Sequence, residues 1–202
     1  MRLHRIEVEN LGSLVGKHTV DLDHDLGNAP IFLIRGPTGA GKSTLLDAVA
    51  LALFGVTPRL QEKVATAKEE LSADDPRQLM SRGTGRSRAE VVFSRLENGV
   101  RRSFECTWSC ARARNRADGR AQGVNRALHE LGPDGQPLPL DKGLHVDTNK
   151  QSVWREPFEQ ALDGLTVDDF RRCILLAQGE FTAFLRSKPE ERGRILARIT
   201  DC

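Results

Sequence analysis

The sequence has no long apolar run. None of its hydrophobic stretches approaches the roughly 20 residues that a membrane-spanning helix requires. Its first five residues include two arginines and a histidine, and they do not lead into the apolar core of a signal peptide. We therefore expect a cytoplasmic protein with no membrane partner.

Cysteine is scarce, and its spacing does not suit a metal site. The four cysteines are Cys106, Cys110, Cys173 and Cys202. They form no C-x-x-C pair and have no neighbouring histidine at ligand spacing. We interpret them as reduced thiols and expect no metal cluster.

An excess of charge of either sign is also missing. The 30 lysines and arginines nearly balance the 28 acidic residues and leave a net charge of +2. Total charge therefore gives no reason to expect nucleic-acid binding, and only local clusters can indicate it. The 202 residues suffice for one sizeable globular domain.

One segment does match a strong pattern, the phosphate-binding motif G-x-x-x-x-G-K-[ST]. Its glycines let the backbone turn tightly and bring N–H groups against phosphate oxygens. Lys42 is expected to reach the β- and γ-phosphates, and Ser43 to offer its hydroxyl to Mg²⁺. The expected nucleotide-binding residues are Gly36, Pro37, Thr38, Gly39, Ala40, Gly41, Lys42, Ser43 and Thr44.

The flanking residues agree with this motif. Residues 31–34 are all apolar and predict a buried strand, while residues 45–54 are rich in leucine and alanine and predict a helix. A strand, a glycine-rich loop and a helix N-terminus form the arrangement that an anionic phosphate needs. The alternative is a plain glycine-rich turn that opens a structural helix, and the agreement of motif and context disfavours it.

The remaining pattern divides the 202-residue lobe into three parts. Residues 1–60 are expected to form the P-loop core, with strand-like segments at 3–9 and 18–22. Residues 89–140 are expected to form a β-hairpin arm. Residues 150–202 are expected to form a helical subdomain.

Local signals place individual elements in these parts. Strands are predicted at 89–93 and 100–108 because Asn98-Gly99 between them is the strongest short hairpin signal. A second hairpin is predicted around Pro133-Asp134-Gly135. Helices are predicted at 154–162 and after the capping residue Thr166.

Arginine is concentrated between residues 95 and 130, where eight arginines stand against four acidic residues. Two interpretations stay open: a solvated arm, or a surface that contacts nucleic-acid phosphates. If the segment is extended, several alternating arginines project from one side. Trp108, just before the cluster, is interpreted as a packing residue. The candidate DNA contacts are Arg112, Arg114, Arg116 and Arg120.

Further short motifs accompany the P-loop. They are Glu-Asn-Leu-Gly-Ser-Leu at 9–14, Thr-Pro-Arg-Leu at 57–60, Gln-Leu-Met-Ser-Arg-Gly at 78–83, Arg-Ala-Arg-Asn at 112–115, Leu-Leu-Ala-Gln-Gly-Glu-Phe at 175–181 and Ser-Lys-Pro-Glu-Glu-Arg at 187–192. Together with residues 36–48, they resemble the N-terminal ATPase lobe of the SbcC family. Its members are bacterial double-strand-break repair ATPases related to SMC proteins. The resemblance spans the whole chain.

The resemblance implies an α/β P-loop NTPase fold of the ABC type, with a mixed core sheet, an antiparallel β flap and C-terminal helices that lead to a coiled coil. It implies ATP and Mg²⁺ as cofactors, with the Walker A loop at Gly36 to Ser43. Gln178 would be the Q-loop glutamine that touches Mg²⁺ or the attacking water. Asn10 and Ser13 would lie close to the nucleotide, although some relatives of the wider family carry arginine in place of the glycine between them. Residues 192–202 would form the root of the coiled coil, where the SbcD nuclease docks.

Two parts of a complete ATPase are missing from the chain. No apolar strand ends in the Asp-Glu of a Walker B motif, and no Leu-Ser-Gly-Gly signature is found. In the family a C-terminal segment beyond the coiled coil supplies both, so we expect half of an ATPase head that is nearly inactive alone. A predicted helix is still running at Cys202, which suggests a shortened form of a longer protein. The implied partners are the C-terminal SbcC lobe, a second SbcC head, the SbcD nuclease and double-stranded DNA of the nucleoid.

Other functions stay open. A nucleotide-gated structural ATPase of the SMC or RecN kind would share the same lobe. A transporter ATPase of the ABC type is less favoured, because residues 15–28 hold no aromatic residue besides two histidines to stack on adenine. A small-molecule kinase is disfavoured because no acceptor-binding lid is recognisable.

Overall fold

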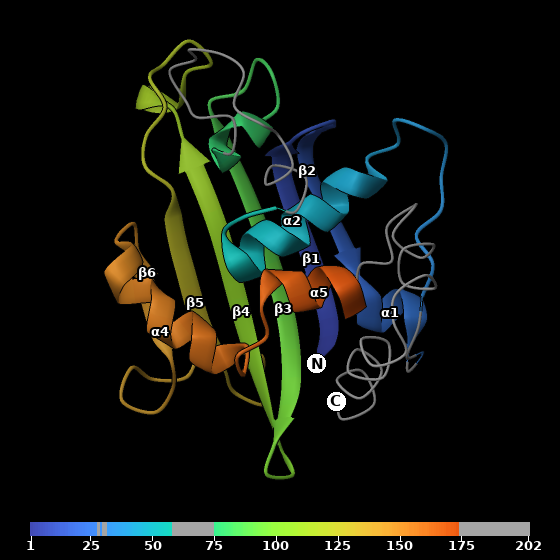
Figure 1. The fold of residues 1–202 in the computed structure, drawn as a ribbon, viewed down its shortest axis with the longest axis vertical. Helices are drawn as coiled ribbons and strands as arrows, with labels where there is room; N and C mark the ends of the chain where they lie inside the picture. The colour runs from blue at the N-terminus through green and yellow to red at the C-terminus, as the bar shows by residue number, and fades with distance from the viewer. Residues whose placement is uncertain (28, 30–31, 58–74, 174–202) are drawn as a thin grey trace.

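The computed structural model describes residues 1–27, 29, 32–57 and 75–173 (Figure 1). Its centre is a six-stranded sheet with the order β2-β1-β3-β4-β5-β6, and every pair of neighbouring strands is antiparallel. The strands are β1 (Arg2–Leu11), β2 (Leu14–Asp21), β3 (Arg86–Glu97), β4 (Val100–Ala111), β5 (Asn125–Leu131) and β6 (His145–Thr148). The helices are α1 (Leu22–Leu26), α2 (Lys42–Phe54), α4 (Gln151–Ala161) and α5 (Val167–Cys173), with short 3-10 turns at Pro76–Leu79 and Ala113–Asn115.

The predicted hairpin at Asn98-Gly99 is confirmed. Asn98 has φ 50° and Gly99 has φ 79°, the left-handed pair that a tight two-residue turn between right-twisted strands requires. The register sets inward side chains of β3 and β4 opposite each other: Val91 faces Cys106, and Ala89 faces Trp108. Trp108 is fully buried in this core, which confirms it as a packing residue.

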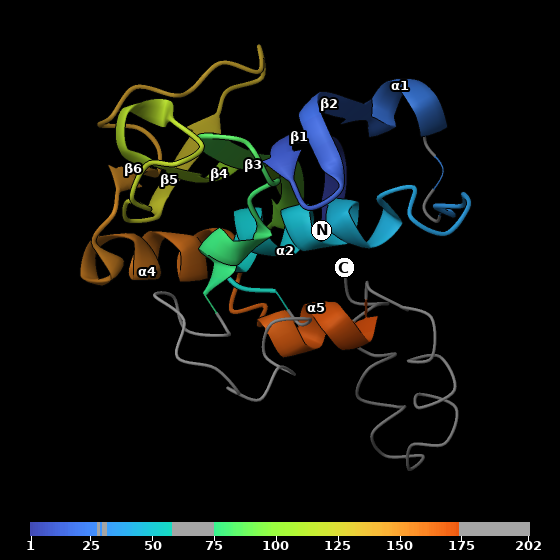
Figure 2. The ribbon, with the colours of Figure 1, turned by 90° about the horizontal axis from the view of Figure 1, so that it is seen from above.

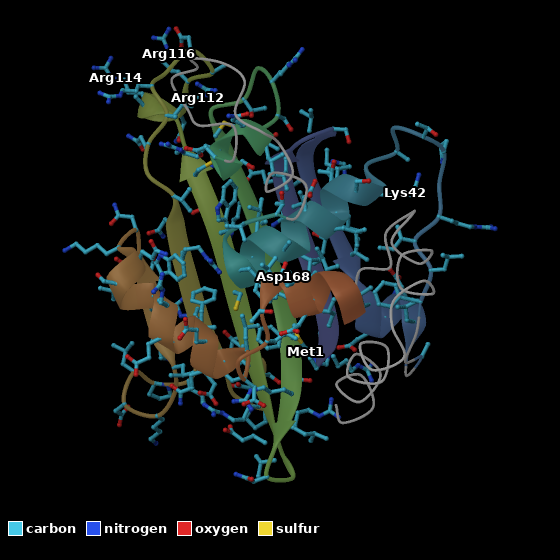
Figure 3. All side chains as sticks on the ribbon, viewed as in Figure 1. Met1, Lys42, Arg112, Arg114, Arg116 and Asp168 are labelled. Atoms are coloured by element: carbon cyan, nitrogen blue, oxygen red, sulfur yellow. The ribbon has the colours of Figure 1, made fainter. Side chains whose placement is uncertain are left out.

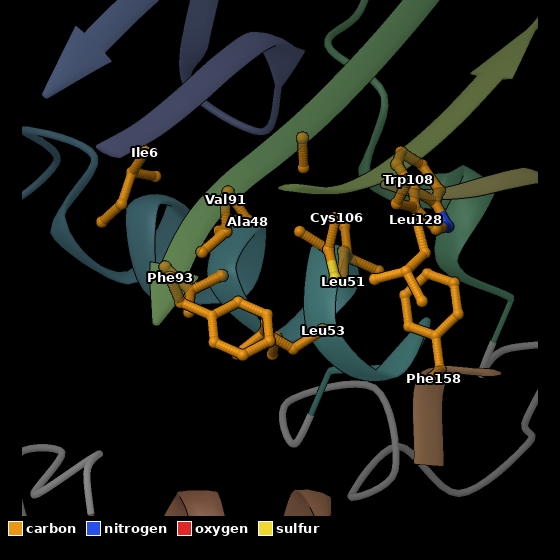
Figure 4. Close-up of a cluster of buried hydrophobic side chains, with 14 of the residues drawn as sticks. Ile6, Ala48, Leu51, Leu53, Val91, Phe93, Cys106, Trp108, Leu128 and Phe158 are labelled. Carbon is orange, nitrogen blue, oxygen red and sulfur yellow. The ribbon is translucent and has the colours of Figure 1, made fainter. Parts of the chain in front are cut away.

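Helices α2, α4 and α5 lie in layers on one face of the sheet, whereas α1 follows the end of β2 at its edge. Figure 2 shows α2 and α4 against the sheet, with α5 beyond α2. The inward residues of β1, β3, β4 and β5 meet α2 in one apolar cluster, and Phe158 of α4 extends this cluster (Figure 4). The ring of Phe170 on α5 lies 5.3 Å from that of Phe54 on α2, so α5 packs on the side of α2 that faces away from the sheet.

The opposite face of the sheet is polar. Ion pairs cross between neighbouring strands there, including Arg5 to Glu90 at 2.8 Å and Lys17 to Glu7 at 2.9 Å. The sheet is therefore two-sided, as expected for an antiparallel sheet with a single helical cover.

The helical predictions hold within the described residues. The helix predicted at 154–162 is α4. The predicted cap of α5 is reciprocal: Asp169 N donates to Thr166 Oγ1 at 3.1 Å, and Thr166 N donates to Asp169 Oδ2 at 3.3 Å. The helix predicted from residue 192 onward lies outside the described residues. Within them, no helix has both the length and the apolar character needed to cross a bilayer.

Three expectations need correction. The buried strand predicted at 31–34 is wrong for its described part: residues 32–34 form no strand, and Leu33 is 83% exposed. No described strand lies beside this segment to pair with its backbone, and an apolar run alone does not make a strand. For the same reason, the parallel pairing of a mixed core sheet does not occur among the described strands. The predicted arm at 89–140 is not a projection, because β3 and β4 form the middle of the sheet.

Candidate nucleotide-binding site

The P-loop leads directly into the buried helix α2. Gly41 is the N-cap residue of α2, with φ 89°, and it supplies no side-chain cap. The first turn also contains no acidic residue. Because the first N–H groups of a helix have no partner within it, the start of α2 presents uncapped donors and the positive end of its dipole. This end of the helix is suited to bind an anion.

Lys42 lies at the mouth of the loop (Figure 3). Its Nζ donates to the carbonyl oxygen of Gly36 at 2.7 Å and to that of Pro37 at 2.8 Å. These two contacts wrap the loop around the ammonium group and use two of its three hydrogens. The third hydrogen remains for a phosphate oxygen, so the loop holds the positive charge where a phosphate would be bound.

The turn between β1 and β2 braces the loop from the sheet side. Ser13 Oγ and Thr44 Oγ1 are hydrogen-bonded at 3.3 Å. A Cβ placed on Gly41 would lie 2.6 Å from Leu14 Cδ2, and one placed on Gly12 would lie 2.8 Å from Thr44 Oγ1. Backbone and side chains therefore approach closely on both sides of the first turn of α2.

A second segment supports this turn from behind. Ser81 N donates to Asn10 O at 2.9 Å, and Ser81 Oγ donates to Gly12 O at 3.0 Å. Gly12 N donates to Leu79 O at 2.6 Å. Sequence reasoning noted the motif at 78–83 but assigned it no role. The structure shows that Ser81, which is 3% exposed, holds the turn that braces the P-loop.

The structure brings most of the predicted site residues together at this point. Asn10 lies at the end of β1 with φ 51°, and its Oδ1 accepts from Gly16 N at 2.8 Å, so this oxygen shapes the turn. Ser43 lies in the first turn of α2, where its hydroxyl fits a Mg²⁺ ligand. No group of three metal-ligating side chains occurs among the described residues, so other oxygens would have to complete such a site. Gln178 lies outside the described residues.

The arginines of the predicted arm divide into two groups. The segment after β4 is not extended, which corrects the expectation that its arginines project from one side. Arg112 Nη1 donates to Gly119 O at 3.1 Å, Arg116 pairs with Asp118 at 3.0 Å, and Arg114 has φ 57° within a 3-10 turn. They form a compact loop at one end of the sheet (Figure 3). Arg114, Arg116 and Arg120 are exposed in this loop, whereas Arg95 and Arg126 are buried inside the lobe.

Cys106 and Cys110 are free and buried, in agreement with their interpretation as reduced thiols. Burial raises the pKa of Cys106 to about 12 and that of Cys110 to about 12. Thiols of this kind are poor nucleophiles at neutral pH. We therefore assign them to the core and not to the site.

A glycine-rich loop that opens a buried helix, with a lysine enclosed at its mouth, defines the class: this is the P-loop lobe of an α/β nucleotide-binding protein. Within that class, the chain belongs to the AAA domain family, whose model matches residues 5–201.

Curated relatives agree with the resemblance seen in the sequence. The chain is 40% identical over 207 residues to the SbcC component of the SbcCD nuclease of Pseudomonas aeruginosa, covering 100% of this chain and 16% of that protein. It is 39% identical to the same component in Rhodobacter capsulatus, covering 99% and 16%. It is 29% identical over 168 residues to a probable DNA double-strand break repair Rad50 ATPase of Aquifex aeolicus, covering 83% and 14%. The resemblance to the SbcC family is confirmed, and the chain spans about one sixth of the length of these relatives.

A solved structure agrees in fold. It is a chain from a study of the ATP-driven dimerization and DNA-stimulated activation of SMC ATPases, with a TM-score of 0.52 and 15% identity. The match covers 98% of this chain and 99% of that chain. It confirms the expected α/β fold.

Proposed function

We propose that this chain is the ATP-binding part of an SbcC-type ATPase head. In the complete protein, ATP binding and hydrolysis would control the access of an SbcD-type nuclease to DNA ends during double-strand-break repair. The observation that carries the proposal is the uncapped start of α2, with the ammonium group of Lys42 held by Gly36 O and Pro37 O. The names of the curated relatives support the repair function.

The chemistry of this half-site is the binding and orientation of a triphosphate. The N–H groups at the start of α2 would bind phosphate oxygens, and Lys42 would neutralise charge between the β- and γ-phosphates. Ser43 would hold Mg²⁺, which when bound offsets the phosphate charge. Ser13 and Thr44 would keep the first turn in place through their mutual hydrogen bond.

The rest of the active site would come from outside the chain. No Walker B carboxylate and no signature motif are found in the sequence, and the apolar residues 32–34 are described without a neighbouring strand. The exposed apolar side chains of Phe32 and Leu33 would suit packing against the C-terminal lobe. A second head would then supply the signature, and the coiled coil would join the two lobes.

Reconstitution tests the proposal. We expect negligible ATP hydrolysis by the chain alone and clear turnover when the C-terminal lobe is added in trans. Lys42→Ala should weaken binding of Mg·ATP, because it removes the charge aimed at the β- and γ-phosphates, whereas Lys17→Ala, a control on exposed strand β2, should leave binding unchanged. Robust turnover by the isolated chain would contradict the half-site model.

A nuclease assay separates the leading proposal from the structural alternative. In an SbcC-type assembly, ATP should change the cleavage of duplex ends by the added nuclease partner. A structural ATPase of the SMC or RecN kind would bind DNA in an ATP-dependent way without this effect.

In the same assembly, Gln178→Ala should depress turnover while shifting the free energy of unfolding by no more than about 0.5 kcal/mol.

Double-stranded DNA is the proposed macromolecular partner, and the arginine loop is the proposed contact. Arg114, Arg116 and Arg120 are exposed together, and the exposed Arg116–Asp118 pair is weak enough for a phosphate to displace. If three phosphates are contacted, the log–log slope of affinity against salt should contain roughly −2.7 from this loop.

Replacing Arg114, Arg116 and Arg120 together by alanine in an assembled head should remove the loop's contribution to the salt slope. Arg101→Ala is the control, because Arg101 is also exposed but lies beside the Asn98-Gly99 turn at the other end of β4. An unchanged slope in the triple variant would mean that the loop is merely solvated.

A further inference from the structure

Arg126 is a buried cation at the far end of the P-loop helix. It extends from β5 and is 1% exposed. Its Nη2 donates to the carbonyl oxygens of Ala52 at 2.9 Å and Leu53 at 3.0 Å, both in the last turn of α2. The start of the same helix carries Lys42. One helix therefore joins the buried guanidinium to the phosphate-binding loop.

Helix carbonyls and aromatic rings take the place of an acidic partner. Among the described residues, no carboxylate forms an ion pair with Arg126. Its guanidinium carbon lies 4.0 Å from the ring centroid of Phe158 and 4.7 Å from that of Trp154, both on α4. The last carbonyls of a helix form the negative end of its dipole, and aromatic faces attract cations. Burial lowers the pKa of Arg126 to about 10, which leaves it charged at neutral pH.

The backbone of α2 is shaped to receive this guanidinium. Gly55 ends the helix with φ 77°, and its N–H donates to Leu51 O at 2.9 Å. A Cβ at this position would lie only 2.4 Å from Arg126 Nη1. The glycine therefore does more than permit a left-handed turn, because it leaves the space in which Arg126 reaches the last carbonyls.

We propose that Arg126 is a positioning residue for the nucleotide site. By binding the last turn of α2, it sets where this rigid helix of about 20 Å begins, and thus where the first-turn N–H groups and Lys42 lie. The aromatic rings on α4 hold Arg126 in place, so contacts between β5 and α4 help to set the position of the phosphate loop. This inference rests on the proposed nucleotide-binding function.

The lobe contains a matched comparison for this role. Arg95, 9% exposed, also binds the end of a helix, α4: Nε donates to Ala161 O at 3.0 Å, and Nη2 donates to Gln160 O at 3.2 Å. Unlike Arg126, it also pairs with a carboxylate, that of Glu97, at 3.3 Å. Its guanidinium carbon lies 5.9 Å from the ring centroid of Phe104. Both arginines therefore bind the last carbonyls of a helix, but α4 carries no phosphate loop. A purely structural role predicts the same consequences at both sites, whereas a positioning role does not.

The experiment compares Arg126→Lys with Arg95→Lys in the full chain. Lysine keeps the charge but cannot reproduce the planar fork of arginine. We expect both variants to lower the unfolding temperature, and only Arg126→Lys to weaken binding of Mg·ATP and of pyrophosphate, by about tenfold. Titrations are made at a temperature at which circular dichroism shows each variant to be folded. Equal loss of affinity in both variants, or no loss in either, would overturn the inference.

A second variant keeps the test decisive if Arg126→Lys does not fold. The new Cβ of Gly55→Ala should push the Arg126 guanidinium away from the last turn of α2. This variant should therefore weaken pyrophosphate binding, as Arg126→Lys does. Unchanged affinity in Gly55→Ala would also count against the inference. A wild-type chain that binds neither ATP nor pyrophosphate would instead refute the proposed function itself, and this inference with it.

Discussion

Gly41→Ala probes the contact between the P-loop and the turn that braces it. Gly41 has φ 89°, a conformation that alanine adopts only at a cost of about 1–2 kcal/mol. The new Cβ would also lie 2.6 Å from Leu14 Cδ2. To relieve this clash, Leu14 has to leave its rotamer, at a further cost of about 0.5–1.5 kcal/mol. We therefore expect a total loss of about 1.5–3.5 kcal/mol in the free energy of unfolding.

The two costs can be separated with a second glycine. Gly39 has φ 85°, but a Cβ there would meet no atom within 4 Å. Gly39→Ala should therefore show only the backbone cost. The Gly41→Ala/Leu14→Ala double variant should be about 1 kcal/mol more stable than the sum of the two single effects predicts. The Gly39→Ala/Leu14→Ala double variant should match the sum of its two single effects.

Urea unfolding measures the backbone cost and the cost of the clash. The variants are Gly41→Ala, Gly39→Ala, each of these combined with Leu14→Ala, and Leu14→Ala alone. The midpoints are compared at a constant m-value, and the double-mutant cycle gives the coupling energy. Coupling of Gly41 to Leu14 below about 0.3–0.5 kcal/mol would refute the packing of the turn against the helix start. Equal coupling at Gly39 and Gly41 would do the same. A confirmed contact should also weaken Mg·ATP binding in Gly41→Ala, because the first turn of α2 has to shift.

Buried polar groups give three further predictions. Ser81→Ala removes the hydroxyl that donates to Gly12 O at 3.0 Å, so the urea midpoint should fall by an amount equivalent to about 1–3 kcal/mol; an unchanged midpoint would contradict the bracing role. The Arg102 guanidinium lowers the pKa of Glu130. The stabilisation by this carboxylate is therefore complete above the unfolded-state pKa of about 4.3 and is lost as pH falls through the folded-state pKa. Glu130→Gln should make the free energy of unfolding fall less steeply at acid pH, and an equally steep fall would argue against the ion pair. Burial raises the pKa of Cys106 to about 12, so mass spectrometry should find Cys106 labelled by iodoacetamide in urea but not in the native chain at neutral pH.

Short-range patterns made several elements predictable. The Asn98-Gly99 hairpin and the Thr166 cap each depend on a few adjacent residues, and both occur as predicted. The loop from Gly36 to Ser43 opens a helix for the same reason, since glycines and the lysine position are set within one segment. Local backbone preference decides these features, and the sequence contains it directly.

The roles of the arginines were not predictable in this way. Eight arginines between residues 95 and 130 look alike in the sequence. Pairing of β3, β4 and β5 in one sheet turns Arg95 and Arg126 inward, to the ends of two helices, while the loop after β4 keeps Arg114 and Arg116 exposed. No local signal marks this division, because it depends on which helix end lies opposite which strand.

The apolar residues 32–34 illustrate the same difference. Composition alone predicted a buried strand, but a strand requires a neighbour for its backbone hydrogen bonds, and no described strand supplies one. The sequence by itself determined the glycine-rich loop that opens α2, the hairpin turn and the helix cap, because each is complete within a few residues. Only the tertiary structure decided that Ser81 braces the loop and that Arg126 holds the end of its helix, because these contacts join residues 69 and 74 positions apart.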